Sequence, residues 1–331
     1  MSEYQGVLIL GEIENGKISS ITKELLGIGR KLANDLGEGL SALLIGSEIK
    51  ALGQEAIVWG ADKVYIADTP ALAAYGSDSY TAITTQVCRE AIPSILLIGQ
   101  TSIGRDVAPR VAARLGVLLS TDCIELRIDL NTRRLIQTRP VYGGNAVAEV
   151  VSKTRPQMAT IRPKSMSPLS PAASRTGDVV PVDIAADALT TKTKTIDRVK
   201  EQVEGIKLED AKVIVAGGFG LGSAKDFDLV RELAKVLGGA VGATRPPCDE
   251  GWISSSLQIG QTGKIVTPDL YIAVGISGAQ QHISGILGSK CIVAINRDPE
   301  ANIFRIADLG VIGDFKEALP ALITKCKELV S

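Results

Sequence analysis

The sequence predicts an α/β protein made of two Rossmann-like domains with mainly parallel sheets. Short buried apolar runs alternate with amphipathic helix patterns in both halves of the chain, as expected for successive βαβ units. The 331 residues are enough for two such domains. Hydrophobic residues make up 45% of the chain but aromatic residues only 4%, so small aliphatic side chains build the cores, as in sheets covered by helices.

The first domain is expected over residues 1–204. Apolar residues recur at spacings of three and four over residues 21–36, which predicts a helix, and a second helix is expected at 103–115. The strands between them are expected at residues 7–10, 42–45, 64–67 and 95–98. Beyond residue 118, turn-linked strands are expected at residues 123–128, 135–138, 146–151, 158–161 and 178–184.

The second domain is expected over residues 205–331. A strand at 212–216 leads into the glycine-rich turn Gly217–Ser223, and a helix with one apolar face follows. Apolar residues at spacings of three and four over residues 315–329 predict the last helix. Further strands are expected at residues 270–274, 291–295 and 309–312.

Composition excludes several classes of protein. The net charge is −1, so there is no basic excess that would indicate a nucleic-acid partner. No apolar run is long enough to span a membrane, and the first residues lack the pattern of a signal peptide, so we expect a cytoplasmic protein. The five cysteines lie far apart without a C-x-x-C pair, which argues against a metal site.

The turn Gly217–Ser223 follows a strand and opens a helix, which is the context of a phosphate-binding turn. It does not match G-x-G-x-x-G, because Ser223 occupies the last glycine position. NAD-binding domains also place an acidic residue at the end of their second strand, where this chain has Arg245. These departures weaken the interpretation as a nicotinamide-dependent dehydrogenase, and a tight connection without a ligand stays open.

Polar residues follow several of the predicted strands. The stretch Ser277–His282 contains the only histidine of the chain, and Asn296 follows the next strand. Prolines fix the backbone after Arg245, while Gln261 and Thr262 offer donors and acceptors in a turn. Carboxyl ends of parallel strands bind ligands in α/β sheets, so these residues are candidates for one site. A purely structural role stays open for each alone, and the absence of G-x-S-x-G argues against a catalytic triad.

Two longer motifs decide which family the chain resembles. They are Leu270–His282 and Cys291–Asp298, and they closely resemble the C-terminal signature of electron-transfer flavoprotein alpha subunits. Shorter motifs match the same family in order and spacing at residues 104–114, 138–145, 242–245, 259–262 and 306–308. The resemblance covers essentially the whole chain.

The resemblance implies an FAD in the second domain. Arg245 would lie over the isoalloxazine and stabilise negative charge on the reduced ring, Thr262 would hydrogen-bond near flavin N5, and His282 would face the N1/O2 edge. A fixed positive charge and N–H donors at that edge suit a flavin that passes single electrons. The residues that complete this part of the site would be Thr244, Ile259, Gly260 and Gln261.

The resemblance also implies which residues would hold the phosphate and adenosine ends of the cofactor. The backbone N–H groups that would hold the pyrophosphate are those of Ser277, Gly278, Ala279, Gln280 and Gln281. Asn296, Asp308 and Leu309 would hold the adenosine end. Many members of the family have an arginine where this chain has Phe219, so we expect the phosphate contact of that side chain to be lost while a backbone contact survives.

The resulting hypothesis is an electron carrier subunit with no independent catalytic activity. The resemblance implies a heterodimer in which the first domain packs against an obligatory beta subunit. The complex would carry electrons from acyl-CoA dehydrogenases in fatty acid β-oxidation to a quinone reductase, or bifurcate electrons from NADH to ferredoxin and an acyl-CoA dehydrogenase-type flavoenzyme. Residues 104–114 and 249–252 favour the bifurcating type. The alternatives are a nicotinamide-dependent dehydrogenase, a transhydrogenase-like Rossmann protein and a ligand-free scaffold.

Overall fold

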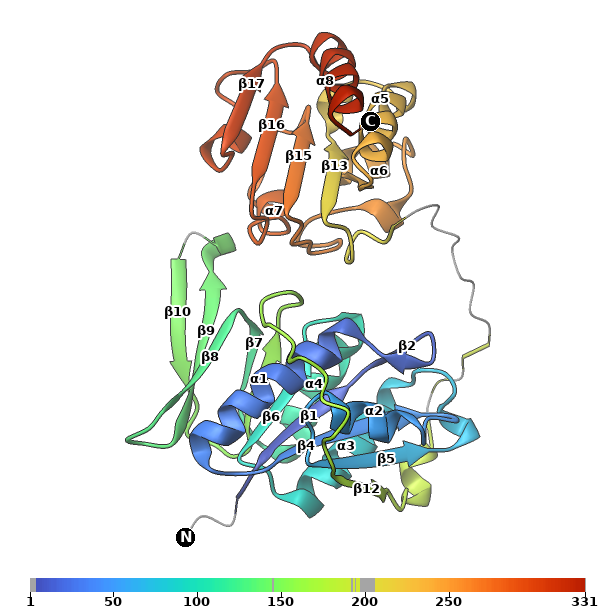
Figure 1. The fold of residues 1–331 in the computed structure, drawn as a ribbon, viewed down its shortest axis with the longest axis vertical. Coiled ribbons are helices and arrows are strands. Elements are labelled where there is room, and N and C mark those ends of the chain that lie inside the picture. The colour runs from blue at the N-terminus through green and yellow to red at the C-terminus, as the bar shows by residue number, and fades with distance from the viewer. Residues whose placement is uncertain (1–3, 145, 192, 194, 197–205, 331) are drawn as a thin grey trace. The chain divides into compact units, whose positions relative to one another are not determined.

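The computed structural model describes residues 4–144, 146–191, 193, 195–196 and 206–330. The chain divides into two compact units, residues 1–141 with 145–199, and residues 142–144 with 200–331 (Figure 1). The expected domain boundary between residues 204 and 205 lies outside the described residues. Both units contain parallel sheets with helices in an α/β arrangement, as the sequence predicts.

The N-terminal unit is built on a seven-stranded parallel sheet with the order β12-β5-β4-β1-β6-β11-β7. Its strands, in chain order, are β1 (Val7–Gly11), β4 (Leu40–Gly46), β5 (Lys63–Asp68), β6 (Ile95–Gly99), β7 (Leu119–Cys123), β11 (Gln157–Ile161) and β12 (Asp178–Pro181). Every residue of β1, β6 and β11 is buried, because helices cover both faces of the sheet.

Four helices cover this sheet. They are α1 (Ser20–Leu36), α2 (Leu52–Val58), α3 (Ser77–Ala91) and α4 (Ser102–Leu115). The apolar residues of α1 and α2 pack in one core and those of α3 and α4 in another, so each pair covers one face. The helix expected at residues 21–36 is α1. Its N-cap is Ser19, whose hydroxyl accepts a hydrogen bond from the Thr22 N–H, and its C-cap is Gly37 in the left-handed conformation.

Two small antiparallel sheets complete the N-terminal unit. One pairs β2 (Ile13–Glu14) with β3 (Lys17–Ile18). The other has the order β10-β9-β8 and comprises β8 (Glu125–Asp129), β9 (Arg134–Val141) and β10 (Ala146–Val151). The single strand expected at residues 123–128 is in fact divided, because β7 joins the large sheet and β8 starts the small one.

The carboxyl edge of the large sheet is filled by side chains that bond to one another. The Thr101 hydroxyl donates to the Glu12 carboxylate at 2.6 Å across the gap between β1 and β6. The Arg162 guanidinium pairs with Asp122 on the far side of β11. Burial raises the pKa of Glu12 to about 7. Protein groups therefore occupy the crevice where a nucleotide binds in many α/β sheets.

The C-terminal unit is built on a five-stranded parallel sheet with the order β14-β13-β15-β16-β17. Its strands are β13 (Val213–Gly217), β14 (Ala240–Ala243), β15 (Leu270–Val274), β16 (Ile292–Asn296) and β17 (Leu309–Ile312). Its helices are α5 (Phe227–Val236), α6 (Arg245–Asp249), α7 (Gln280–Ile283) and α8 (Phe315–Val330).

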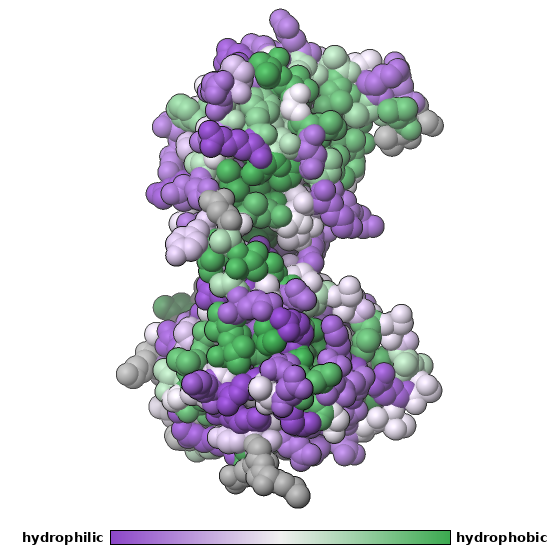
Figure 2. All heavy atoms as spheres, turned by 90° about the vertical axis from the view of Figure 1, so that its left-hand side faces the viewer, coloured by the Kyte–Doolittle hydropathy of each residue, from purple (hydrophilic) through white to green (hydrophobic). Residues whose placement is uncertain are grey.

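The two faces of this sheet are covered differently. The apolar residues of α5 and α8 pack on one face (Figure 1). Loop residues such as Ile259, Ile286 and Ile303 pack on the other. The edge strand β17 is exposed along its whole length, and hydrophobic side chains gather on the side of the C-terminal unit that Figure 2 turns to the viewer.

Across the described residues, no helix is both long and apolar enough to cross a membrane. The same residues include no group of three or more His, Cys, Asp or Glu side chains that could hold a metal ion.

Candidate functional site

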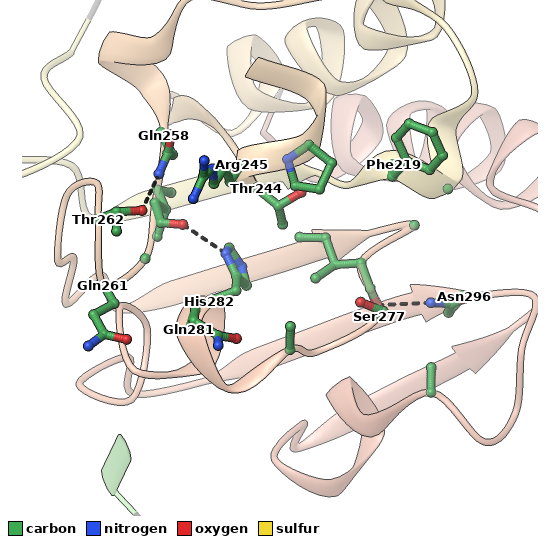
Figure 3. A pocket seen from close by; sticks show the side chains of 18 of the residues that line it. Phe219, Thr244, Arg245, Gln258, Gln261, Thr262, Ser277, Gln281, His282 and Asn296 are labelled. Atoms are coloured by element: carbon green, nitrogen blue, oxygen red, sulfur yellow. Dashed lines mark hydrogen bonds between the residues drawn. The ribbon is translucent and has the colours of Figure 1, made fainter. Parts of the chain in front are cut away.

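The C-terminal sheet has one topological switch point, at the carboxyl ends of β13 and β15. The chain leaves β13 toward β14 on one side and returns to β15 on the other. Connections from adjacent strands therefore diverge here, and the crevice between them is where open α/β sheets bind ligands. A cavity of about 610 Å³ lies at this point (Figure 3), within the size range of cofactor sites.

Glycines bring the two loops that follow these strands into backbone contact. The Gly218 N–H donates to the Val274 carbonyl at 2.8 Å, and the Gly220 N–H donates to the Gly275 carbonyl at 3.0 Å. A Cβ atom added to Gly218 would lie 2.2 Å from the Gly275 oxygen, so only glycine fits. Gly220 and Gly275 both line the cavity, which gives one part of its wall to bare backbone.

Most of the residues predicted for the site line this one cavity. They are Phe219, Thr244, Arg245, Ile259, Gly260, Gln261, Thr262, Ser277, Ala279, Gln281, His282 and Asn296. The predicted residues that do not line it are Gly278, Gln280, Asp308 and Leu309. The structure thus brings together side chains from four separate connections, all beyond the carboxyl ends of strands.

Arg245 begins α6 directly after β14 and contributes a positive charge to the cavity wall. Pro246 and Pro247 occupy the first turn of this helix, where their missing N–H groups need no partner. The Arg245 Nε donates to the Asp249 carboxylate at 3.1 Å, one helical turn away. Both side chains are largely exposed, so the pair is weak and leaves the guanidinium free to contact an anion.

The turn Gln258–Gly263 forms the wall next to α7. The Gln261 N–H donates to the Gln281 carbonyl at 2.8 Å, which ties the turn to the helix. The Gln258 amide donates to the Thr262 hydroxyl at 2.8 Å (Figure 3). Since that hydroxyl oxygen accepts one bond, its own proton remains available for an acceptor atom on a ligand.

His282 lies in α7, is almost fully buried and lines the cavity. Its Nδ1 lies 3.0 Å from the Ile259 carbonyl oxygen, and its Nε2 lies 2.9 Å from the Tyr271 hydroxyl. Burial lowers the pKa of His282 to about 4. The histidine is therefore neutral at physiological pH, and protein groups already engage both of its ring nitrogens.

Ser277 and Gly278 form the turn between β15 and α7. Ser277 accepts a hydrogen bond from the Ile303 N–H at 3.1 Å through its carbonyl. Gly278 has φ = +82°, and a Cβ atom there would lie 2.2 Å from the Ile303 nitrogen. Gly278 thus shapes the turn by close packing against residues 302–305 and does not line the cavity.

Asn296, at the carboxyl end of β16, closes the opposite part of the wall. Its amide nitrogen donates to the Ile276 carbonyl at 2.9 Å (Figure 3), and its amide oxygen accepts from the Asp298 N–H at 3.0 Å. These bonds fix the side chain between the loops that follow β15 and β16. One amide N–H remains for a ligand.

The expectation that Asp308 and Leu309 act beside Asn296 is wrong. The Asp308 carboxylate accepts a hydrogen bond from the Ile292 N–H at 2.7 Å, and its own N–H donates to the Ile292 carbonyl. Ile292 begins β16 whereas Asn296 ends it, so Asp308 lies at the opposite edge of the sheet. The carboxylate that follows the carboxyl end of β17 is that of Asp314, which lies 3.8 Å from the Arg297 guanidinium.

Sequence reasoning missed several residues of the wall. They are Gly220, Pro246, Gln258, Gly275, Ile276, Asp298 and Ala301. Each lies within a few residues of one that was predicted, so the position after a strand end is the signal that would have found them. Phe219 stacks on Trp252 with ring centroids 5.3 Å apart and planes 8° apart, an aromatic pair that the sequence did not reveal.

Comparisons with known proteins agree with one another over the whole chain. A family model described as electron transfer flavoprotein domain matches residues 7–187, and one described as electron transfer flavoprotein FAD-binding domain matches residues 207–287. An electron transfer flavoprotein subunit alpha from Thermoanaerobacterium thermosaccharolyticum is 44% identical over 99% of this chain and 100% of the relative.

Two further relatives have names that differ from each other. An electron transfer flavoprotein subunit alpha from Bacillus subtilis is 43% identical over 98% of each chain. A protein named lactate dehydrogenase (NAD(+),ferredoxin) subunit LctC from Acetobacterium woodii is 40% identical over 98% of this chain and 77% of the relative.

Proposed function

Because this chain belongs to the electron transfer flavoprotein alpha-subunit family, we propose that its C-terminal unit binds FAD and carries electrons within a heterodimer with a beta subunit. The single observation that carries the proposal is the cavity at the switch point of the second sheet. One part of its wall is glycine backbone, while another holds a cationic side chain and a hydroxyl donor.

The residues present suit a dinucleotide that carries a flavin. Gly220 and Gly275 present bare backbone to the cavity, where a pyrophosphate could approach closely. The free hydroxyl proton of Thr262 suits the acceptor nitrogen N5 of a flavin. Arg245 would favour negative charge on a reduced ring. Asn296 and, in place of Asp308, Asp314 would hold the adenosine end at the same sheet edge.

FAD would supply the redox chemistry, and the chain would bind the cofactor, orient it and set its potential. The beta subunit would pack on the N-terminal unit, whose own crevice is closed by the Glu12–Thr101 bond. As a subunit of an electron carrier, the chain would receive and pass on electrons through partner proteins.

Two classes of complex would differ in their electron donor and acceptor. We propose exchange with an acyl-CoA dehydrogenase-type flavoenzyme, as in fatty acid β-oxidation. The name of the Acetobacterium relative supports a second arrangement, in which the complex couples NAD to ferredoxin by electron bifurcation.

Co-expression with a beta subunit tests the proposal. We expect a yellow heterodimer from which denaturation releases FAD. Gly220→Val should release less FAD per heterodimer, because its side chain would overlap the Gly275 backbone and distort the glycine wall. Reduction by NADH in the presence of ferredoxin would identify the bifurcating class. A folded heterodimer that is colourless after incubation with FAD would contradict the proposal.

A further inference from the structure

We propose that Tyr271 is a positioning residue for the cofactor site, because it holds the His282 ring in a single orientation together with the Ile259 carbonyl. The three groups come from β15, α7 and the turn Gln258–Gly263, so the clamp ties two segments of the cavity wall to a strand of the sheet behind them. The effect on FAD rests on the proposed function, whereas the state of the histidine does not.

The partners of His282 determine where its proton lies. A carbonyl oxygen only accepts hydrogen bonds, so Nδ1 must carry the proton and donate to Ile259. In the neutral ring, Nε2 then has a lone pair and accepts the hydrogen bond from the Tyr271 hydroxyl. The clamp therefore selects the Nδ1–H tautomer.

Protonation of the ring would break this arrangement. Both nitrogens of an imidazolium donate, so the Tyr271 oxygen would have to accept and its own proton would lose its partner. Tyr271 is fully buried, and an unpaired buried donor costs about 1–3 kcal/mol. Burial also lowers the pKa of His282, so it too favours the neutral ring.

The clamp assigns different tasks to His282 and Arg245, which both line the cavity. His282 would contribute a fixed neutral ring, with neither nitrogen free to exchange a proton with the cofactor. Arg245 is the only cationic side chain among the described residues that line the cavity, so charge stabilisation falls to it. Removal of Tyr271 should thus loosen cofactor binding without adding a charge.

The first test is the ¹⁵N spectrum of the full chain labelled with ¹⁵N-histidine. His282 is the only histidine, so one pair of ring resonances appears, and His282→Gln confirms its assignment. We expect a protonated Nδ1 and a hydrogen-bonded, unprotonated Nε2 that stay unchanged from about pH 6 to pH 8. An Nε2–H tautomer or an imidazolium in that range would overturn the proposal.

The second test is Tyr271→Phe, which removes only the hydroxyl and conserves the volume of the ring. We expect the Nε2 resonance to move downfield because it loses its donor, while Nδ1 stays in place. The freed ring must be ordered again when FAD binds, so we expect a Kd for FAD about two- to tenfold higher in the heterodimer.

A matched control separates this effect from a general loss of a tyrosine hydroxyl. Tyr80→Phe removes a hydroxyl that donates to the Ile45 carbonyl in the N-terminal unit, and should leave both readouts unchanged. An unshifted Nε2 resonance in Tyr271→Phe would overturn the clamp. Failure of the wild-type heterodimer to bind FAD would instead contradict the proposed function and leave the tautomer result intact.

Discussion

Arg245 is held by its backbone more than by its side chain. The prolines after it fix the start of α6, while its guanidinium has one exposed partner, Asp249. Arg245 lines the cavity and Asp249 lies one helical turn away, so the two opposite charges should act on a bound anion with opposite signs.

The two charges make opposite predictions for the redox potential. In Arg245→Gln we expect the midpoint potential of bound FAD to fall by roughly 20–60 mV, because the reduced anion loses a favourable charge. In Asp249→Asn we expect a smaller rise, because the guanidinium is no longer partly neutralised. Spectroelectrochemical titration of the heterodimer measures both.

The control is Arg231→Gln, which removes a cation from a similar exposed pair, with Asp228 on α5. Arg231 does not line the cavity, so the midpoint potential of FAD bound to the Arg231→Gln variant should match that of the wild type. A fall of equal size in both arginine variants would show that only the total charge matters, contrary to our assignment.

At the scale of elements, short turns after the strands decide the shape of the site. The turn between β15 and α7 depends on Gly278, which has a left-handed backbone and packs against the nitrogen of Ile303. A side chain at this position would force apart the connections that follow β15 and β16. The rigidity of the cavity thus depends on a residue that does not line it.

We expect Gly278→Ala to destabilise the C-terminal unit by about 2–4 kcal/mol, from backbone strain and from steric overlap. Gly313→Ala is the matched control, because an added Cβ atom there has no atom within 4 Å and the residue needs no positive φ. Urea unfolding of the full chain, followed by circular dichroism, compares the two. Equal midpoints would mean that the turn adapts without strain.

The elements show how far the sequence predicts the molecule. The α/β class was predictable because apolar runs such as 7–10 and 270–274 are buried on both faces, which leaves an unmistakable pattern. The division of residues 119–129 between two sheets was not, since both strands have similar local patterns and only long-range pairing distinguishes them.

The candidate site was predictable to a similar degree. Residues at or just beyond the carboxyl ends of strands, such as Arg245, Ser277 and Asn296, all line the cavity, because parallel strands end at one edge. Asp308 was misplaced because it precedes β17, and the two ends of a strand are opposite edges of the sheet. The bonds of His282 depend on Tyr271, whose buried hydroxyl no local pattern reveals.

On the scale of the whole molecule, two parallel sheets use the same edge in different ways. In the N-terminal unit, side chains such as Glu12 and Thr101 fill the crevice, and in the C-terminal unit the corresponding place is a cavity. In the N-terminal unit this arrangement shields the Glu12 carboxyl group from water. The stability of the protein should therefore depend on pH.

We expect the free energy of unfolding to fall as the pH rises from about 5 to 8. The folded pKa of Glu12 is raised to about 7 from 4.5, so the folded state binds the proton more tightly in this window and loses that advantage as pH passes through the folded value. Glu24, also raised to about 7, adds to the effect.

Glu12→Gln should remove part of this dependence, with a gain of about 1 kcal/mol at pH 8 relative to pH 5, since Glu12 is partly exposed. Glu90→Gln, at an exposed carboxylate, controls for the change in net charge. Urea unfolding at the two pH values provides the measurement. A wild-type protein whose stability rises over this range would contradict the assignment.

Because Trp252 stacks on Phe219 of the cavity wall, its fluorescence can report on the cavity. The chain has two tryptophans, Trp59 in the N-terminal unit and Trp252 against a residue of the cavity wall. Replacement of Trp59 by phenylalanine would leave a single indole whose emission overlaps the absorption of an oxidised flavin. Quenching of that emission would then report the arrival of the cofactor directly, in real time and without any added label.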